Sequence, residues 1–256
     1  MKFMKTVRSA LPDEIMERRL FTAKDGTPLP YRIYLPEDYD CGKSYPLVLF
    51  MHGAGERGTD NSLHLTRIAN VCDLILSDIE KYGDCVIIAP QCPVTVQWVD
   101  TPWEKGGYSV KEVKKSVYMK AAEELLAATI SDYSIDKKRI YVSGLSMGGF
   151  ATWDIVMRNP ELFAAAVPVC GGADPEMAER IKQVPIWTIH STGDLLVPFS
   201  GTEDMVLALE NVGGDIRFTR TDLYGHSAWL GIYDTTEVVD WIFSKKRVSD
   251  GRFSEE

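Results

Sequence analysis

The stretch from Ile140 to Phe150 constrains the fold of this chain more than any other. An apolar, β-prone run leads into the pattern Gly-x-Ser-x-Gly centred on Ser146, and a helix-compatible segment, residues 151–158, follows. This order of strand, sharp turn and helix lifts a serine clear of a sheet edge. Glycine is expected at 144 and 148 because side chains there would collide with neighbouring backbone. The stretch therefore predicts an α/β sheet with Ser146 as a candidate nucleophile.

Apolar strand-like runs alternate with segments of helical spacing along the rest of the chain. The first two expected strands, Arg18 to Thr22 and Tyr31 to Leu35, flank the pair Asp25-Gly26, which predicts a hairpin. Further strands are expected at 45–51, 85–90, 140–142, 163–169, 185–190 and 216–223, and further helices at 62–81, 110–131, 202–212 and 236–246. This alternation indicates a mostly parallel sheet of about eight strands with helices on both faces.

The length of 256 residues suits one α/β domain with a substantial core. We therefore expect a single domain, 1–256, in which residues 1–14 form an N-terminal extension and residues 248–256 a polar tail. The longest irregular stretch, 91–107, is too short to form a large cap over the sheet.

Charge and cysteine usage narrow the function classes. A net charge of −9 and a pI near 5.1 argue against nucleic-acid or anionic-membrane partners, which need a basic surface. The N-terminal region carries charges throughout, and no run approaches the roughly 18 apolar residues of a membrane span. The five cysteines lack metal-type spacing and are expected to stay reduced. We expect a cytoplasmic protein.

A serine hydroxyl needs a base to become a nucleophile, so Ser146 requires an imidazole nearby. Among the four histidines we favour His226, because it lies in the loop between the last expected strand and the last expected helix. From there a side chain can swing over the serine. His52, His64 and His190 remain alternatives, and each can also be read as a hydrogen-bonded structural histidine.

The histidine in turn needs a carboxylate that fixes its tautomer and stabilises the imidazolium. Asp194 follows the expected strand 185–190, at the sheet edge where ligands bind in α/β proteins. The alternatives are Asp204, Asp222 and Asp234. Because Asp204 falls in an expected helix and Asp222 in an expected strand, both are better read as surface acids.

The glycine-rich loop 52–58 predicts the remaining part of the site. A tetrahedral intermediate needs two N–H groups aimed at one oxygen. One is expected from Met147, the residue after the serine, and the other from Ala54 or, as second choice, Gly53. Neither this loop nor residues 144–149 carry the spacing of phosphate-binding glycine loops.

Together these motifs resemble the α/β-hydrolase superfamily over nearly the whole chain. The closest likeness is to compact carboxylesterases grouped with feruloyl and acetyl xylan esterases, dienelactone hydrolase and prolyl-oligopeptidase-like hydrolases. The matching segments are residues 52–61, 89–93 with Trp98, 144–149, 190–194 with Val197-Pro198, and His226 with Trp229. The resemblance implies a Ser146, Asp194 and His226 triad, an oxyanion hole from Ala54 and Met147, and ester hydrolysis without metal or cofactor.

The chain departs from some of these relatives because it has neither a β-propeller nor a large cap. That suggests an open site for small acyl groups. The expected substrates are small-molecule or oligosaccharide esters, with feruloyl or acetyl esters favoured. Gly53, Trp98, Trp103 and Trp229 are the candidate substrate-binding residues, although the tryptophans can equally cover core edges. Two rival interpretations are an amide or peptide hydrolase and a non-catalytic binding protein on the same fold.

Overall fold

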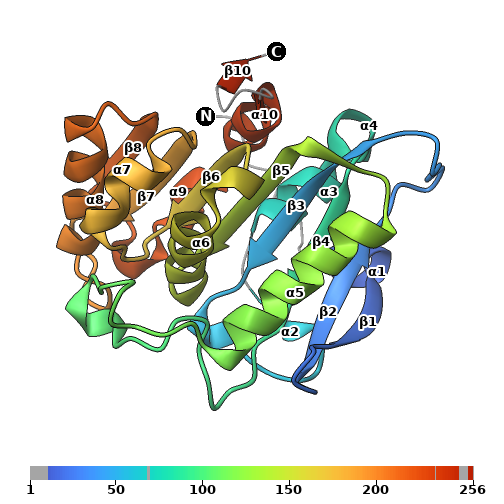
Figure 1. The fold of residues 1–256 in the computed structure, drawn as a ribbon, viewed down its shortest axis with the longest axis horizontal. Helices are drawn as coiled ribbons and strands as arrows, with labels where there is room; N and C mark the ends of the chain where they lie inside the picture. Colours follow the sequence, from blue (N-terminus) through green and yellow to red (C-terminus); the bar gives the residue numbers. More distant parts are fainter. Residues whose placement is uncertain (1–10, 68–69, 234, 248–252, 256) are drawn as a thin grey trace, which may run out of the picture.

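The computed structural model describes residues 11–67, 70–233, 235–247 and 253–255 (Figure 1). In this described part, one sheet of eight strands has the order β1-β2-β4-β3-β5-β6-β7-β8. The strands β3 to β8 run parallel, while β1 pairs with β2 and β2 with β4 in antiparallel fashion. The predicted mostly parallel sheet is therefore confirmed. The sheet strands are β1 (Glu17–Thr22), β2 (Pro28–Tyr34), β3 (Tyr45–Met51), β4 (Val86–Pro90), β5 (Ile135–Leu145), β6 (Ala165–Val169), β7 (Ile186–Ser191) and β8 (Ile216–Thr221).

Helices cover both faces of the sheet, and Figure 1 views it with α5 and α6 in front. The helices are α1 (Leu11–Ile15), α2 (Leu63–Thr66), α3 (Val71–Ser77), α4 (Ile79–Tyr82), α5 (Val117–Asp132), α6 (Met147–Arg158), α7 (Ala178–Ile181), α8 (Ser200–Asn211), α9 (Trp229–Ile232) and α10 (Glu237–Ser244). Short 3-10 turns lie between them: η1 (Ala54–Glu56), η2 (Trp103–Lys105), η3 (Pro160–Leu162), η4 (Pro175–Met177) and η5 (Gly225–Ser227). No helix in these described ranges is long and apolar enough to cross a membrane.

The apolar strands divide their side chains between two cores. Successive strand residues point to opposite faces, so Leu47 and Leu49 of β3 join the core beneath α5, α6 and α8. Val48 and Phe50 join the core beneath α3 and α10. Every residue of β3 is buried, as expected for a strand covered on both faces. The two cores fix the strand whose end carries the loop 52–58.

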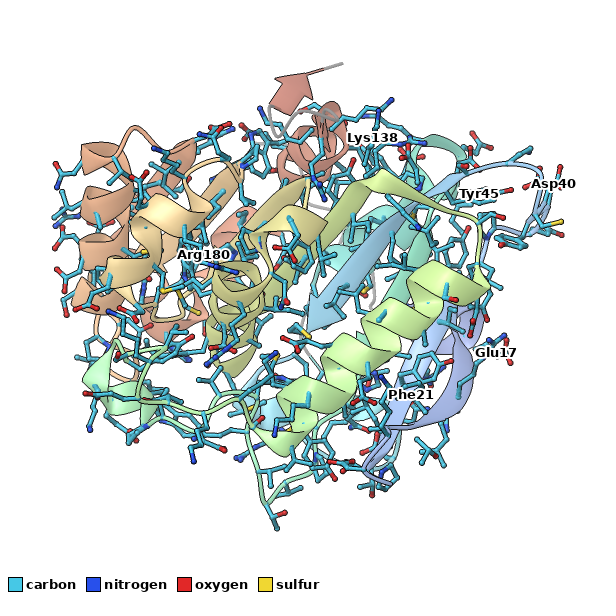
Figure 2. All side chains as sticks on the ribbon, in the orientation of Figure 1. Glu17, Phe21, Asp40, Tyr45, Lys138 and Arg180 are labelled. Atoms are coloured by element: carbon cyan, nitrogen blue, oxygen red, sulfur yellow. The ribbon has the colours of Figure 1, made fainter. Side chains whose placement is uncertain are left out.

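The helix α6 is held at its C-terminal end by an arginine from α7. Arg180, labelled in Figure 2, donates from Nε to the carbonyl of Met157 at 2.9 Å and from Nη2 to that of Arg158 at 2.9 Å. The last carbonyl groups of a helix have no N–H donor within the helix, and a positive charge near them is favourable. This contact anchors the helix that begins directly after Ser146.

The expected single helix over 62–81 is wrong, because capping residues divide that segment. Asn70 accepts from the N–H of Cys72 and, with Asp73, forms a capping box that starts α3. Asp78 accepts from the N–H of Lys81 and starts α4. An N-cap has non-helical backbone, so α3 cannot continue backwards through Asn70 nor α4 through Asp78; α2 ends earlier, at Thr66. The apolar spacing was real, but it is distributed over three short helices.

Two other boundaries moved for local reasons. The helix expected from 110 begins at Val117, because Ser116 accepts from the N–H of Met119 as its N-cap. The elbow strand, expected at 140–142, extends over all of β5, because Ile135 still pairs with Tyr45 of β3; the polar residues 136–139 form an irregularity in the register between this pair and the pair of Ile140 with Leu47. Within the tail expected at 248–256, residues 253–255 form β10, which pairs with β9 (Lys245–Arg247).

Candidate active site

Ser146 occupies the sharp turn between β5 and α6. Its backbone has φ 54° and ψ −119°, in a region that non-glycine residues rarely adopt. The turn is stabilised by the Ser146 N–H, which donates to the carbonyl of Val169 at 2.9 Å. A Cβ on Gly144 or Gly148 would overlap the carbonyl oxygen of Met51. The glycines of the motif are therefore required because α6 passes so close to the end of β3.

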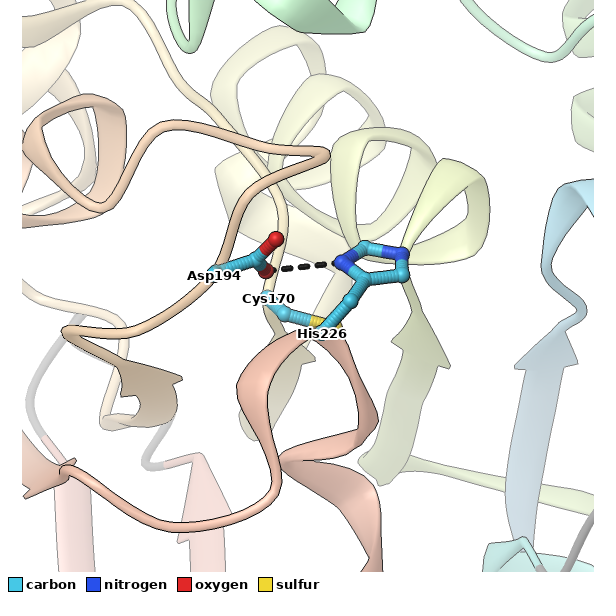
Figure 3. Close-up of side chains that lie close together, drawn as sticks. All are labelled: Cys170, Asp194 and His226. Carbon is cyan, nitrogen blue, oxygen red and sulfur yellow. Dashed lines mark hydrogen bonds and ion pairs between the residues drawn. The ribbon is translucent and has the colours of Figure 1, made fainter.

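Three side chains from distant segments meet at this turn. The Oγ of Ser146 lies 2.8 Å from Nε2 of His226. Nδ1 of His226 lies 2.7 Å from Oδ2 of Asp194, and Figure 3 shows this pair. His226 belongs to η5 after β8, and Asp194 to the loop after β7. All three thus lie at the carboxyl edge of the sheet. The structure brings together the serine, the favoured base and the favoured acid.

Asp194 is buried and held by four hydrogen bonds. Its Oδ1 accepts from the N–H groups of Leu196 and Val197, each at 2.9 Å. Its Oδ2 interacts with His226 and also with Nε2 of His190, at 3.1 Å. Burial raises the pKa of Asp194, but these hydrogen bonds outweigh burial and hold the pKa well below its usual range. The carboxylate is therefore ionised and fixed in orientation toward His226.

The other candidate histidines have structural partners. His52 is fully buried; its Nε2 accepts from the N–H of Cys92 at 2.9 Å, so Nδ1 donates to the carbonyl of Gly53 at 2.7 Å. His64 lies 3.0 Å from the carbonyl of Ala89 through Nε2. Burial lowers the pKa of His52 to about 4 and that of His64 to about 3. Both are neutral scaffold residues, and His190 supports the acid.

Two of the three alternative acids are surface residues, as expected. Asp204 is exposed on α8, and Asp222 is exposed after β8. Asp234 lies outside the described residues. The role of His190 as a second partner of Asp194 was missed at the sequence level. The sequence shows that His190 and Asp194 are four residues apart, but it does not show that the chain turns after β7 and brings the two side chains together.

Two backbone N–H groups border the serine. Met147 is the first residue of α6 and Ala54 the first of η1, so neither N–H has an acceptor within its own helix. A Cβ on Gly53 would lie 2.6 Å from Oε2 of Glu56 and 2.8 Å from Cδ1 of Leu145, so a larger residue there would have to displace both side chains. Arg57 holds the loop from outside by donating from Nε to the carbonyl of Ala54 at 2.9 Å. These donors suit an oxyanion beside Ser146.

A cleft of about 340 Å³ opens over the serine. Trp103 and Trp229 both line it, and the Trp229 ring stands edge-on to His226 with centroids 5.5 Å apart. The lining residues are Gly53, Ala54, Gly55, Glu56, Arg67, Trp103, Leu145, Ser146, Leu196, Val197, His226 and Trp229. The cleft thus combines an apolar wall with a few polar groups, as small-molecule sites do.

Trp98 does not belong to this cleft, so its predicted substrate contact is corrected. Its side chain is fully buried and its Nε1 donates to the carbonyl of His52 at 3.1 Å. Its ring also packs against that of His52, with centroids 5.2 Å apart. Trp98 therefore supports the loop 52–58 from beneath.

Cys170 lies beside the triad at the end of β6, with a positive φ of 41° (Figure 3). Its Sγ and the facing atoms of Asp194 and His226 lie within 4.8 Å of one another, a grouping that resembles a three-ligand metal site. Asp194 and His226 are already hydrogen-bonded to each other through Oδ2 and Nδ1. Burial also raises the pKa of the Cys170 thiol well above its usual range, which disfavours the thiolate a metal needs.

Fold and site together define the class of the protein: it is an α/β-hydrolase. A family model described as "Putative esterase" matches residues 23–212, and the chain therefore belongs to the Esterase family. A solved structure entitled a thermostable esterase is 34% identical, with a TM-score of 0.82, over 93% of this chain and 64% of that chain. A ferulic acid esterase structure shares the fold at 18% identity and a TM-score of 0.66, over 89% of this chain and 98% of that one.

Curated relatives match at lower identity. The bifunctional acetylxylan esterase/xylanase XynS20E of Neocallimastix patriciarum is 29% identical over 98 residues, which cover 38% of this chain and only 14% of the relative. The "Probable feruloyl esterase C" of Aspergillus niger is 23% identical over 211 residues, covering 77% of this chain and 71% of the relative. The chain therefore spans a small part of the first relative and most of the second.

Proposed function

We propose that this chain is a serine carboxylesterase whose nucleophile is Ser146. The observation that carries the proposal is the continuous hydrogen-bonded path from Ser146 through His226 to Asp194. Such a path activates a serine for attack on an acyl carbon. Membership of the Esterase family supports an ester as the bond that is cleaved.

The reaction follows from the roles of these groups. Nε2 of His226 accepts the Ser146 proton as Oγ attacks the ester carbonyl, and the N–H groups of Ala54 and Met147 stabilise the oxyanion. The protonated His226 then donates to the departing alkoxide, which leaves as the alcohol. A water molecule, deprotonated by His226, attacks the acyl-enzyme and releases the acid. Asp194 stabilises the imidazolium in both halves.

We propose feruloyl or acetyl esters of small carbohydrates as the substrate class. The names of the relatives support this class, and the cleft walls formed by Trp103 and Trp229 suit a sugar or phenolic ring. The test compares kcat/KM on methyl ferulate, acetylated xylo-oligosaccharides, simple butyryl esters and a peptidyl-coumarin amide. The proposal predicts that a carbohydrate or feruloyl ester is the best substrate. Faster cleavage of the amide than of every ester would overturn it.

A further inference from the structure

One cation lines the cleft within the described part of the chain, apart from any charge on His226. Arg67 follows α2 and reaches the wall formed by the loop 52–58. Its Nη1 donates to the carbonyl of Gly55 at 2.7 Å, and its guanidinium carbon would lie 3.7 Å from a Cβ placed on Gly55. The guanidinium therefore lies flat over Gly55, and even a Cβ on that residue would be in ordinary van der Waals contact with it.

This position puts positive charge next to the candidate oxyanion donor. Gly55 directly follows Ala54, and neighbouring α-carbons are about 3.8 Å apart. A group bound by Arg67 is therefore separated from the ester carbonyl by only a short linker. Because one carbonyl already fixes the guanidinium, little side-chain freedom is lost when it binds a further acceptor.

Glu56 is the one acid that faces Arg67 among the described residues that line this cleft. It leaves the outer N–H groups of the Arg67 guanidinium free. Oε1 of Glu56 is 4.0 Å from Nε of Arg67, too far for a hydrogen bond. Glu56 is buried beneath Gly53. Burial raises the pKa of Glu56, whereas Arg67 and the backbone N–H groups of Gly53 and Glu56 act in the opposite direction. In the described ranges Nη2 of Arg67 has no protein acceptor, and the side chain is 56% exposed.

The surroundings of Arg67 make its positive charge selective for an anionic group on the substrate. The facing walls are apolar, from Leu145, Leu196 and Trp229, and the protein as a whole carries a net charge of −9. An anion approaching elsewhere on the surface is repelled on average. At Arg67 it meets a planar fork of donors that matches a carboxylate.

We propose that Arg67 is a specificity-determining residue that selects esters bearing a carboxylate a short distance from the ester bond. The inference rests on the proposed function, since it concerns the substrate of the same site. The carboxylate belongs to either the acyl or the alcohol part, and the two arms of the test below separate these cases.

The test uses two pairs of substrates, and within each pair the two esters have the same skeleton around the ester bond. Monomethyl glutarate and methyl butyrate differ by a carboxylate on the acyl side, and 3-acetoxybenzoate and phenyl acetate differ by one on the alcohol side. We compare kcat/KM for the wild type, Arg67→Gln, Arg67→Lys and Lys182→Gln. Lys182 is the matched control for net charge, because it precedes β7 at the opposite edge of the sheet.

Charge-assisted hydrogen bonds are strong, so we expect Arg67→Gln to lower kcat/KM about tenfold or more on the charged ester of at least one pair. Both neutral esters are expected to change less than about twofold. Arg67→Lys should retain part of the preference, and Lys182→Gln all of it. In the wild type, added salt should slow the charged ester and leave the neutral one unchanged.

Equal losses on charged and neutral esters in both pairs would overturn the inference, because Arg67 would then only hold the loop at Gly55. Unchanged kcat/KM of Arg67→Gln on both charged esters would also overturn it. If Arg67→Gln does not fold, the wild type alone decides: a preference for the charged ester that does not depend on salt would overturn the inference. Failure of the proposed function looks different. In that case a Ser146→Ala protein would hydrolyse the neutral esters as fast as the wild type.

Discussion

Nε2 of His190 lies 3.1 Å from Oδ2 of Asp194, the same oxygen that pairs with His226. Nε2 also lies 3.1 Å from the carbonyl of Val197, so both of its partners are acceptors and this nitrogen carries the proton. Nδ1 of His190 is held by the hydroxyl of Thr202 at 2.7 Å. The ring is completely buried. His190 therefore fixes the carboxylate that orients the candidate base.

Replacing His190 should impair turnover without removing any group that touches substrate. For His190→Phe we expect kcat to fall about 10- to 100-fold, as is typical when the partner of a functional ligand is removed. KM should change little. His190→Gln keeps an N–H donor and should recover part of kcat. Steady-state kinetics on p-nitrophenyl acetate checks this, and a folded His190→Phe protein with wild-type kcat would contradict it.

Asp194→Asn should be far more damaging. The amide has nearly the same shape, but it cannot stabilise the imidazolium or enforce the Nδ1–H tautomer of His226. We expect kcat to fall by about 10³- to 10⁴-fold. We also expect a lower melting temperature, because the amide nitrogen would face the N–H of His190 in a buried position. The measurement is kcat at pH 7 together with a melting curve. A loss smaller than tenfold in a folded protein would show that Asp194 is not the acid of the triad.

The close approach of α6 to β3 makes a stability prediction. Gly148→Ala would force a Cβ into the carbonyl of Met51, so we expect the free energy of unfolding to fall by about 3 kcal/mol or more. Gly193→Ala is the matched control, since a Cβ there has its nearest neighbour at 3.8 Å. Its cost should stay near 0.5 kcal/mol, roughly that of an ordinary surface change. Denaturant unfolding at pH 7 compares the two, and similar costs would refute the packing argument.

His64 should make stability depend on pH. Its folded pKa is lowered to about 3, whereas an exposed histidine titrates near 6.5, so on acidification the unfolded chain binds the proton first. The contribution of neutral His64 to the free energy of unfolding is complete above roughly pH 6.5 and is lost as the pH falls toward 3.

Between pH 7 and 5.5 this loss amounts to about 1 kcal/mol in the wild type. His64→Gln can still donate to the carbonyl of Ala89, but it does not titrate. Its destabilisation relative to the wild type should therefore be about 1 kcal/mol smaller at pH 5.5 than at pH 7. Denaturant unfolding at both pH values tests this. A cost that does not vary with pH would contradict the assignment of a neutral, buried His64.

The sequence was informative where one local pattern determines the backbone. The turn at Ser146 needs glycines before and after it, and the alternating strands specify the edge at which Asp194 and His226 lie. It was less informative where contacts come from across the fold. Nothing near Trp98 shows that its indole turns inward to His52, and apolar spacing alone did not reveal that Asn70 interrupts a helix. His190 was visible as a residue but not as a partner of the acid.

The central claim is that Ser146 attacks the substrate. The most direct measurement is hydrolysis of p-nitrophenyl acetate and methyl ferulate by the wild type and by Ser146→Ala, side by side, with melting curves to show that both are folded. We expect the wild type to hydrolyse both esters and the variant to lose both activities by at least about 10³-fold. A folded Ser146→Ala protein with wild-type activity would show that the strained turn is only a structural feature and that the reaction occurs elsewhere.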